Sequence, residues 1–124
     1  MNFVLTDEQQ RIRDAALALC RPFDDDYWLR KDTDGGFPEE LYRAMADGGW
    51  LGICIPPEHG GSGLGLAEAS VIMEEINRSG GNSGACHGQM YNMGTLLRHG
   101  SPEQKAHYLP KIASGELRLQ SMGL

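Results

Sequence analysis

Residues 53–65, ICIPPEHGGSGLG, decide how the rest of this chain is interpreted. The adjacent prolines Pro56 and Pro57 end any regular element that enters the stretch, because proline lacks a backbone N–H and has a fixed φ. Four glycines follow within the six residues 60–65 and let the backbone turn where a side chain would clash. The stretch therefore predicts a loop whose backbone lies close to another part of the protein or to a ligand.

A phosphate-binding loop is the functional interpretation of such glycines, but the surrounding residues do not fit it. In the dinucleotide pattern G-x-G-x-x-G, Gly61 and Gly63 match the first two glycines, yet Leu66 occupies the third position. The other phosphate-loop pattern requires Gly-Lys-Ser/Thr, and this loop has no lysine. Because a glycine cluster without its partner residues is a weak motif, we favour a tight, buried connection between two helices.

The composition predicts one folded domain. The chain has 124 residues, of which 40% are hydrophobic, and a net charge of −6 that argues against non-specific nucleic-acid binding. Its three cysteines, Cys20, Cys54 and Cys86, lack C-x-x-C spacing, which predicts free thiols in a reducing compartment. No apolar stretch is long enough to span a membrane, and the N-terminus lacks the pattern of a signal peptide. We therefore expect a cytoplasmic protein.

Hydrophobic periodicity predicts a helical chain. Capping boxes mark two helix starts, at Thr6 with Gln9 and at Ser101 with Gln104. The triplet Asp24-Asp25-Asp26 is expected to cap a short helix rather than bind a cation. Pro110 is expected to break or kink the last helix, with a further turn that can reach Ser114. The apolar residues 50–55 are expected to be extended. The expected helices cover residues 7–20, 24–31, 38–48, 66–79, 83–99 and 102–108.

Residues 83–99 combine helical spacing with glycines that weaken a helix by about 1 kcal/mol each relative to alanine. Gly84 and Gly88 are four residues apart, so they open one face to close approach. His87 and Tyr91 lie on a neighbouring strip. Two interpretations remain, tight helix packing with His87 and Tyr91 at its rim, or a ligand channel beside them, and we favour packing.

The end of the chain has a different pattern. Leu117, Leu119 and Ser121 alternate with polar residues, which predicts a strand. A single strand has no partner in a helical chain and is not stable alone. This end of the sequence therefore looks like the start of an element that is missing.

A complete active site is not apparent in the sequence. The four histidines have no metal-ligand spacing, and no G-x-S-x-G motif is present. Cys86 and His87 are adjacent, which points their side chains apart on a helix and disfavours a thiolate–imidazole pair. Glu74 and Glu75 are expected to be solvated, with Glu74 pairing with Arg78. We predict neither catalytic residues nor a metal site in this chain.

The order of several short motifs resembles the N-terminal domain of acyl-CoA dehydrogenases. Together they are collinear with that domain over about residues 3–124, although each alone would be weak. The motifs are residues 37–41 (FPEEL), 49–53 (GWLGI), 55–64 (IPPEHGGSGL), 73–76 (MEEI), 100–105 (GSPEQK) and 108–116 (YLPKIASGE).

The resemblance implies an all-α fold, an orthogonal bundle of about five to six helices, for residues 1–116. Residues 117–124 would then be the first strand of a truncated middle β domain. In that family a C-terminal four-helix bundle follows. The main FAD contacts and the catalytic glutamate lie beyond Leu124. That glutamate removes the α-proton of an acyl-CoA thioester while the flavin accepts the β-hydride. This chain alone is therefore expected to be inactive and to bind FAD weakly.

By position, the resemblance places Ser83, His87, Met90 and Tyr91 in the wall of the acyl pocket. A bulky tyrosine and a polar histidine suit a short, polar or ring-containing acyl group better than a long straight chain. The complete enzyme would pass electrons to an acceptor and form a homo-oligomer. Alternative assignments are a related acyl-CoA oxidase or flavin monooxygenase, or a non-catalytic helical interaction module, which a natural stop after Leu124 would favour.

Overall fold

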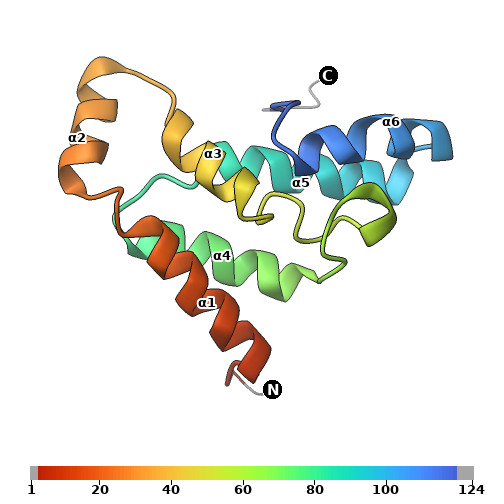
Figure 1. The fold of residues 1–124 in the computed structure, drawn as a ribbon, viewed down its shortest axis with the longest axis horizontal. Coiled ribbons are helices and arrows are strands. Elements are labelled where there is room, and N and C mark those ends of the chain that lie inside the picture. Colours follow the sequence, from red (N-terminus) through yellow and green to blue (C-terminus); the bar gives the residue numbers. More distant parts are fainter. Residues whose placement is uncertain (1–2, 120–124) are drawn as a thin grey trace.

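The computed structural model describes residues 3–119, in which helices joined by turns and loops are the regular secondary structure (Figure 1). The all-α prediction is confirmed. Within the described residues there is no strand, and no helix is long and apolar enough to cross a bilayer. The elements are α1 (Asp7–Cys20), α2 (Asp25–Asp34), α3 (Glu39–Asp47), the 3-10 turn η1 (Pro57–His59), α4 (Leu66–Arg78), α5 (Gly84–His99) and α6 (Pro102–Ala113).

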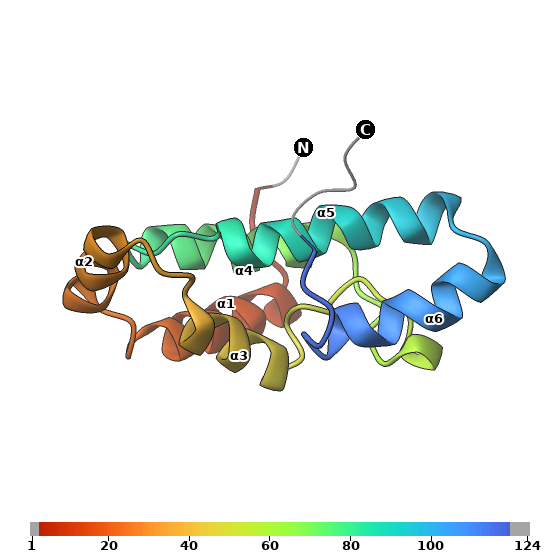
Figure 2. The ribbon, with the colours of Figure 1, turned by 90° about the horizontal axis from the view of Figure 1, so that it is seen from above.

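The helices pack as pairs around one core (Figures 1 and 2). α1 lies along α4. The two helices run in the same direction, as the hydrogen bond from Gln9 near the start of α1 to Glu68 near the start of α4 shows. α5 packs on α6 and also contacts α3 and α4. α2 lies at one end of the molecule. The largest fully buried apolar side chains are Leu41, Tyr42, Met45, Leu51, Ile55, Ile72, Ile76, Met93, Leu109 and Ile112.

Three helices begin at the caps that the sequence predicts. Thr6 accepts from the backbone N–H of Gln9 at 3.2 Å, and the Gln9 side chain accepts from the N–H of Thr6 at 3.1 Å. Ser101 and Gln104 form the same box at the start of α6. Asp24 accepts from the N–H of Tyr27 at 3.0 Å. Each cap satisfies an N–H that would otherwise lack a partner at the helix end.

The last helix is not broken at Pro110. α6 continues through Pro110 to Ala113. Pro110 lies in the last turn on the exposed side, where the lost N–H costs least. Leu109 and Ile112 are both fully buried, and their burial holds this turn against the core.

The loop at 53–65 is the tight connection that the sequence predicts, but the prediction of an extended segment at 50–55 is wrong. These residues form consecutive turns, with the N–H of Ile55 donating to the carbonyl of Gly52 at 3.0 Å. The loop folds back onto them, and the N–H groups of Gly63 and Leu64 donate to Ile55 and Ile53. Leu51, Ile53 and Ile55 are all buried. An extended chain would also place these alternate residues on one face, so the burial pattern could not distinguish the two conformations, whereas the turn hydrogen bonds do.

The predicted strand at 117–124 is not formed over its described part. Residues 117–119 have no strand partner, because the described chain contains no other strand. Their backbone is bonded instead to the side chain of Gln89 and to the carbonyl of Lys111. Residues 120–124 lie outside the described residues, so the domain division at 116/117 stays a prediction.

Candidate functional site

α5 presents two different faces. Its inward face is buried against the core and carries Cys86, Gly88, Gln89, Met90, Asn92, Met93 and Leu96. Its outward face carries small, polar and aromatic residues, among them Gly84, His87, Tyr91, Gly94 and Thr95, which are all exposed. Gly84 is therefore exposed whereas Gly88 is buried, so the two glycines do not line one open groove.

The structure brings together three of the four predicted pocket residues. The rings of His87 and Tyr91 meet edge to face with their centroids 5.2 Å apart, and Tyr91 is 42% exposed. Ser83 lies one turn before His87, whose N–H donates to the Ser83 carbonyl, and the Ser83 hydroxyl accepts from Asn77 at 3.0 Å. Met90 lies apart from them, because it is buried in the core cluster.

The expectation that Glu75 is solvated is wrong. Its side chain is fully buried, and its Oε1 lies 2.9 Å from Nε of Arg13 and 3.2 Å from Nη1 of Arg78. Glu74 pairs with Arg13 from α1 rather than with Arg78. A signal was present in the sequence, since Glu75 follows the buried Ile72 by three residues and so shares its face.

Two further buried polar side chains were not predicted. Gln89 is fully buried on α5 and bonds to backbone groups of residues 112, 117 and 119. Asn92 is also fully buried, and its Nδ2 donates to the carbonyl of Gly88 at 2.7 Å. Its Oδ1 is buried without a hydrogen-bond partner. The spacing Cys86, Gln89, Met93 could have indicated that Gln89 faces the core.

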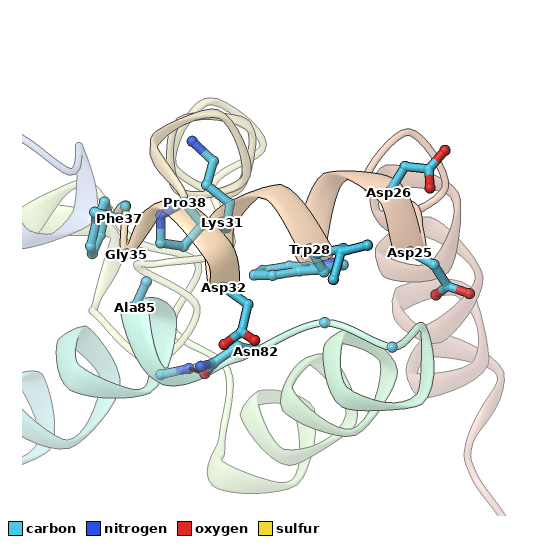
Figure 3. Close-up of a pocket in the computed structure, with 15 residues that line it drawn as sticks. Asp25, Asp26, Trp28, Lys31, Asp32, Gly35, Phe37, Pro38, Asn82 and Ala85 are labelled. Atoms are coloured by element: carbon cyan, nitrogen blue, oxygen red, sulfur yellow. Dashed lines mark hydrogen bonds between the residues drawn. The ribbon is translucent and has the colours of Figure 1, made fainter.

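A hollow of about 1040 Å³ lies between α2 and the start of α5 (Figure 3). The apolar residues Trp28 and Phe37 line it beside the carboxylates of Asp25, Asp26 and Asp32. None of the predicted pocket residues lines this hollow. The expected acyl-pocket wall on α5 and this hollow are therefore different parts of the surface.

The buried thiols and the tyrosine of α2 are not poised for catalysis. Burial raises the pKa of the Cys86 thiol to about 12 and also raises that of Cys20, which keeps both in the unreactive thiol form. Burial and a hydrogen bond to Glu40 raise the pKa of Tyr27 to about 12. No group of three or more His, Cys, Asp or Glu in residues 3–119 is arranged to hold a metal ion.

The glycine loop offers no free amides to a phosphate. The N–H groups of residues 60–64 all donate to backbone carbonyls, and that of Gly65 donates to the Glu68 carboxylate at 2.9 Å. A phosphate cradle requires several such groups to point at the ligand. The described residues therefore do not fit a flavin-phosphate site at this loop.

Comparisons with known proteins agree with this architecture. The family model described as acyl-CoA dehydrogenase, N-terminal domain, matches residues 6–116. Among curated relatives, the mitochondrial isovaleryl-CoA dehydrogenase of Oryza sativa is 43% identical over 89 residues, covering 68% of this chain and 22% of that protein. A probable acyl-CoA dehydrogenase of Bacillus subtilis is 32% identical over 126 residues, covering 100% of this chain and 33% of that protein.

Solved structures show the same fold. The acyl-CoA dehydrogenase of Geobacillus kaustophilus superposes with a TM-score of 0.84 at 24% identity, over 95% of this chain and 31% of that one. This chain spans only about a fifth to a third of the length of the curated relatives it matches. With a family model that matches nearly all of its helical part, the chain belongs to the acyl-CoA dehydrogenase family, whose N-terminal domain it represents.

Proposed function

We propose that this chain is the N-terminal part of a flavin-dependent dehydrogenase that forms an α,β double bond in an acyl-CoA thioester. The observation that supports the proposal is the outward face of α5. There His87 and Tyr91 present an aromatic edge to solvent on a helix whose other face is buried. In a domain that spans at most a third of its relatives, such a face is available to become a wall once the remaining polypeptide docks.

The chain's own contribution is to shape the acyl pocket and to exclude water from it, not to perform the chemistry. FAD would accept the hydride in the complete enzyme, and the loop amides described above are already used within the domain. We therefore place the flavin site and the catalytic base in the regions of the relatives' length that these residues do not cover. His87, Tyr91 and Ser83 would contact the acyl group, whereas Met90 would support the wall from behind.

The proposed substrate has a short, branched, polar or ring-containing acyl group. Tyr91 occupies the outward face where a long straight chain would need space, and one relative is named for isovaleryl-CoA, a short branched thioester. An electron-transfer acceptor and a homo-oligomeric enzyme complete the proposal. We also propose a cytoplasmic location, although the rice relative is mitochondrial; cell fractionation decides between the two.

The test uses the complete polypeptide encoded around these residues, purified with FAD. Anaerobic bleaching of the flavin by a panel of acyl-CoA thioesters should be fastest with short branched or cyclic acyl groups. Tyr91→Ala should shift preference toward longer chains, whereas Tyr108→Ala, an exposed tyrosine on α6, should not. A wild-type preference for palmitoyl-CoA contradicts the proposed substrate class, and the absence of bleaching by any thioester contradicts the dehydrogenase.

The same assay separates the alternative functions. Reaction of the reduced flavin with oxygen to give hydrogen peroxide during turnover would identify an oxidase, and an oxygenated product would identify a monooxygenase. A complete gene product that ends at Leu124 and binds neither FAD nor acyl-CoA would favour the non-catalytic interaction module.

A further inference from the structure

Residues 115–119 are held firmly although they form no regular element. Leu117 and Leu119 pack against the core, and the N–H of Leu117 donates to the carbonyl of Lys111 at 3.0 Å. The hydroxyl of Tyr42 on α3 donates to the carbonyl of Gly115 at 3.0 Å. Residues 117–119, the exit segment, therefore leave the helical domain along a defined path. In Figure 2 this segment follows α6 and rises beside the middle of α5.

Gln89 supplies the bonds that a neighbouring strand would otherwise give. Its Nε2 donates to the carbonyl of Leu117 at 2.9 Å and to that of Ile112 at 3.2 Å. Its Oε1 accepts from the N–H of Leu119 at 2.6 Å. The side chain is fully buried, so both ends of the amide are satisfied without water.

A second contact fixes the other side of the exit segment. Nη1 of Arg118 lies 2.7 Å from Oε1 of Glu39, and its guanidinium stacks 4.1 Å from the centroid of the Phe37 ring. These contacts are partly exposed, so they contribute less than the buried amide. Gln89 is thus the buried point where α5, α6 and the exit segment meet.

We propose that Gln89 is a positioning residue that fixes the exit segment relative to the outward face of α5. Gln89 lies between His87 and Tyr91 in the sequence but points to the opposite side of the same helix. A movement of α5 is therefore transmitted to the polypeptide that follows Leu119. This rests on the proposed function, in which that polypeptide carries the flavin site that must meet the α5 wall.

The first test measures the anchoring directly in the 124-residue chain by amide hydrogen exchange. Gln89→Leu keeps the side-chain volume and removes all three bonds. Exchange at the Leu119 amide should accelerate by about tenfold or more, while exchange at Ile76 in α4 stays within about twofold. Gln10→Leu, at an exposed glutamine of α1, is the matched control and should leave Leu119 unchanged.

A second variant covers the case in which Gln89→Leu does not fold. The carboxyl introduced by Gln89→Glu can donate one bond, to Leu117, when it is protonated. Its charged form still accepts from Leu119 but donates to neither carbonyl and is repelled by those of Leu117 and Ile112. Protection of Leu119, relative to the wild type at the same pH, should therefore fall as pH rises. Equal protection at Leu119 across the wild type and both variants overturns the proposal.

The last arm measures the consequence in the complete enzyme. Gln89→Leu should lower kcat/KM for dehydrogenation of the thioester by about tenfold or more. This loss should be present well below the melting temperature of the variant, so that unfolding does not account for it. Rapid exchange at Leu119 with unchanged kcat/KM would refute positioning. If the wild type is not bleached by any thioester, the proposed function and the catalytic role of Gln89 fall together, while the exchange data still decide the anchoring.

Discussion

Replacing Gly61 by alanine should destabilise the protein more than the same replacement at any other glycine of residues 60–65. A Cβ at residue 61 would overlap the carbonyl oxygen of Ile55 and lie 2.5 Å from that of Gly52. Both obstacles are backbone atoms, so no side-chain rotation relieves them. Either the loop or the turns at 50–55 must move.

The magnitude follows from what that movement breaks. The carbonyls of Gly52 and Ile55 accept from Ser62 and Gly63, at 3.2 and 2.8 Å. Losing these two hydrogen bonds costs about 1 kcal/mol each, and overpacking adds about 1–3 kcal/mol. The expected loss in the free energy of unfolding is therefore about 3–5 kcal/mol, or about 10–20 °C in Tm for a domain of this size.

Urea denaturation followed by helical circular dichroism measures this loss. The matched control is Gly94→Ala, at an exposed site in α5 where an added Cβ meets nothing within 4 Å. The control should stabilise the protein by about 1 kcal/mol, because alanine favours a helix over glycine. A loss below about 1 kcal/mol for Gly61→Ala would show that the loop adapts and that its close packing is not required.

Three other outcomes are expected. Glu75→Gln should destabilise the protein by about 2–3 kcal/mol, because it removes a fully buried carboxylate that pairs with both Arg13 and Arg78. Glu74→Gln, at a side chain that is 59% exposed, should cost less than about 0.5 kcal/mol in the same denaturation assay. With a thiol reagent at pH 8, half-buried Cys54 should react first, and fully buried Cys86 only on unfolding; mass spectrometry of the labelled peptides would contradict this if Cys86 reacted first. Hydrogen bonds from the backbone N–H of Glu40 and from the Tyr27 hydroxyl lower the pKa of the Glu40 carboxyl from 4.5 to about 2. The charged carboxyl therefore contributes stability above pH 4.5 that is lost as the pH falls toward 2. The Tm measured from pH 6 to pH 2 should fall less steeply in Glu40→Gln than in the wild type, and an equal slope would refute this.

Local signals in the sequence predicted the helices well. The caps at Thr6, Asp24 and Ser101 act within three residues, so no tertiary information was needed to place those helix starts. The motif order likewise identified the family. Pro110 was misjudged because its cost depends on position within α6 and on burial of its neighbours, which the local pattern does not reveal.

The candidate site was less predictable because its geometry is tertiary. The buried Glu75 carboxylate is paired with Arg13 of α1, a residue that is distant in the sequence. Residues 117–119 alternate like a strand, yet Gln89 from α5 takes the place of a strand partner. The spacing of α5 placed His87 and Tyr91 together, and their role in a pocket stays a prediction.

The parallel packing of α1 on α4 has a consequence for the order of folding. The bonds that join these helices, from Gln9 to Glu68 and from Arg13 to Glu74, connect residues 59 and 61 positions apart. Because such contacts close a long segment of chain, they form slowly. The α5–α6 hairpin, by contrast, is joined by a short turn. During synthesis α1 must therefore wait, with its apolar stripe not yet packed on α4, until α4 has been synthesised.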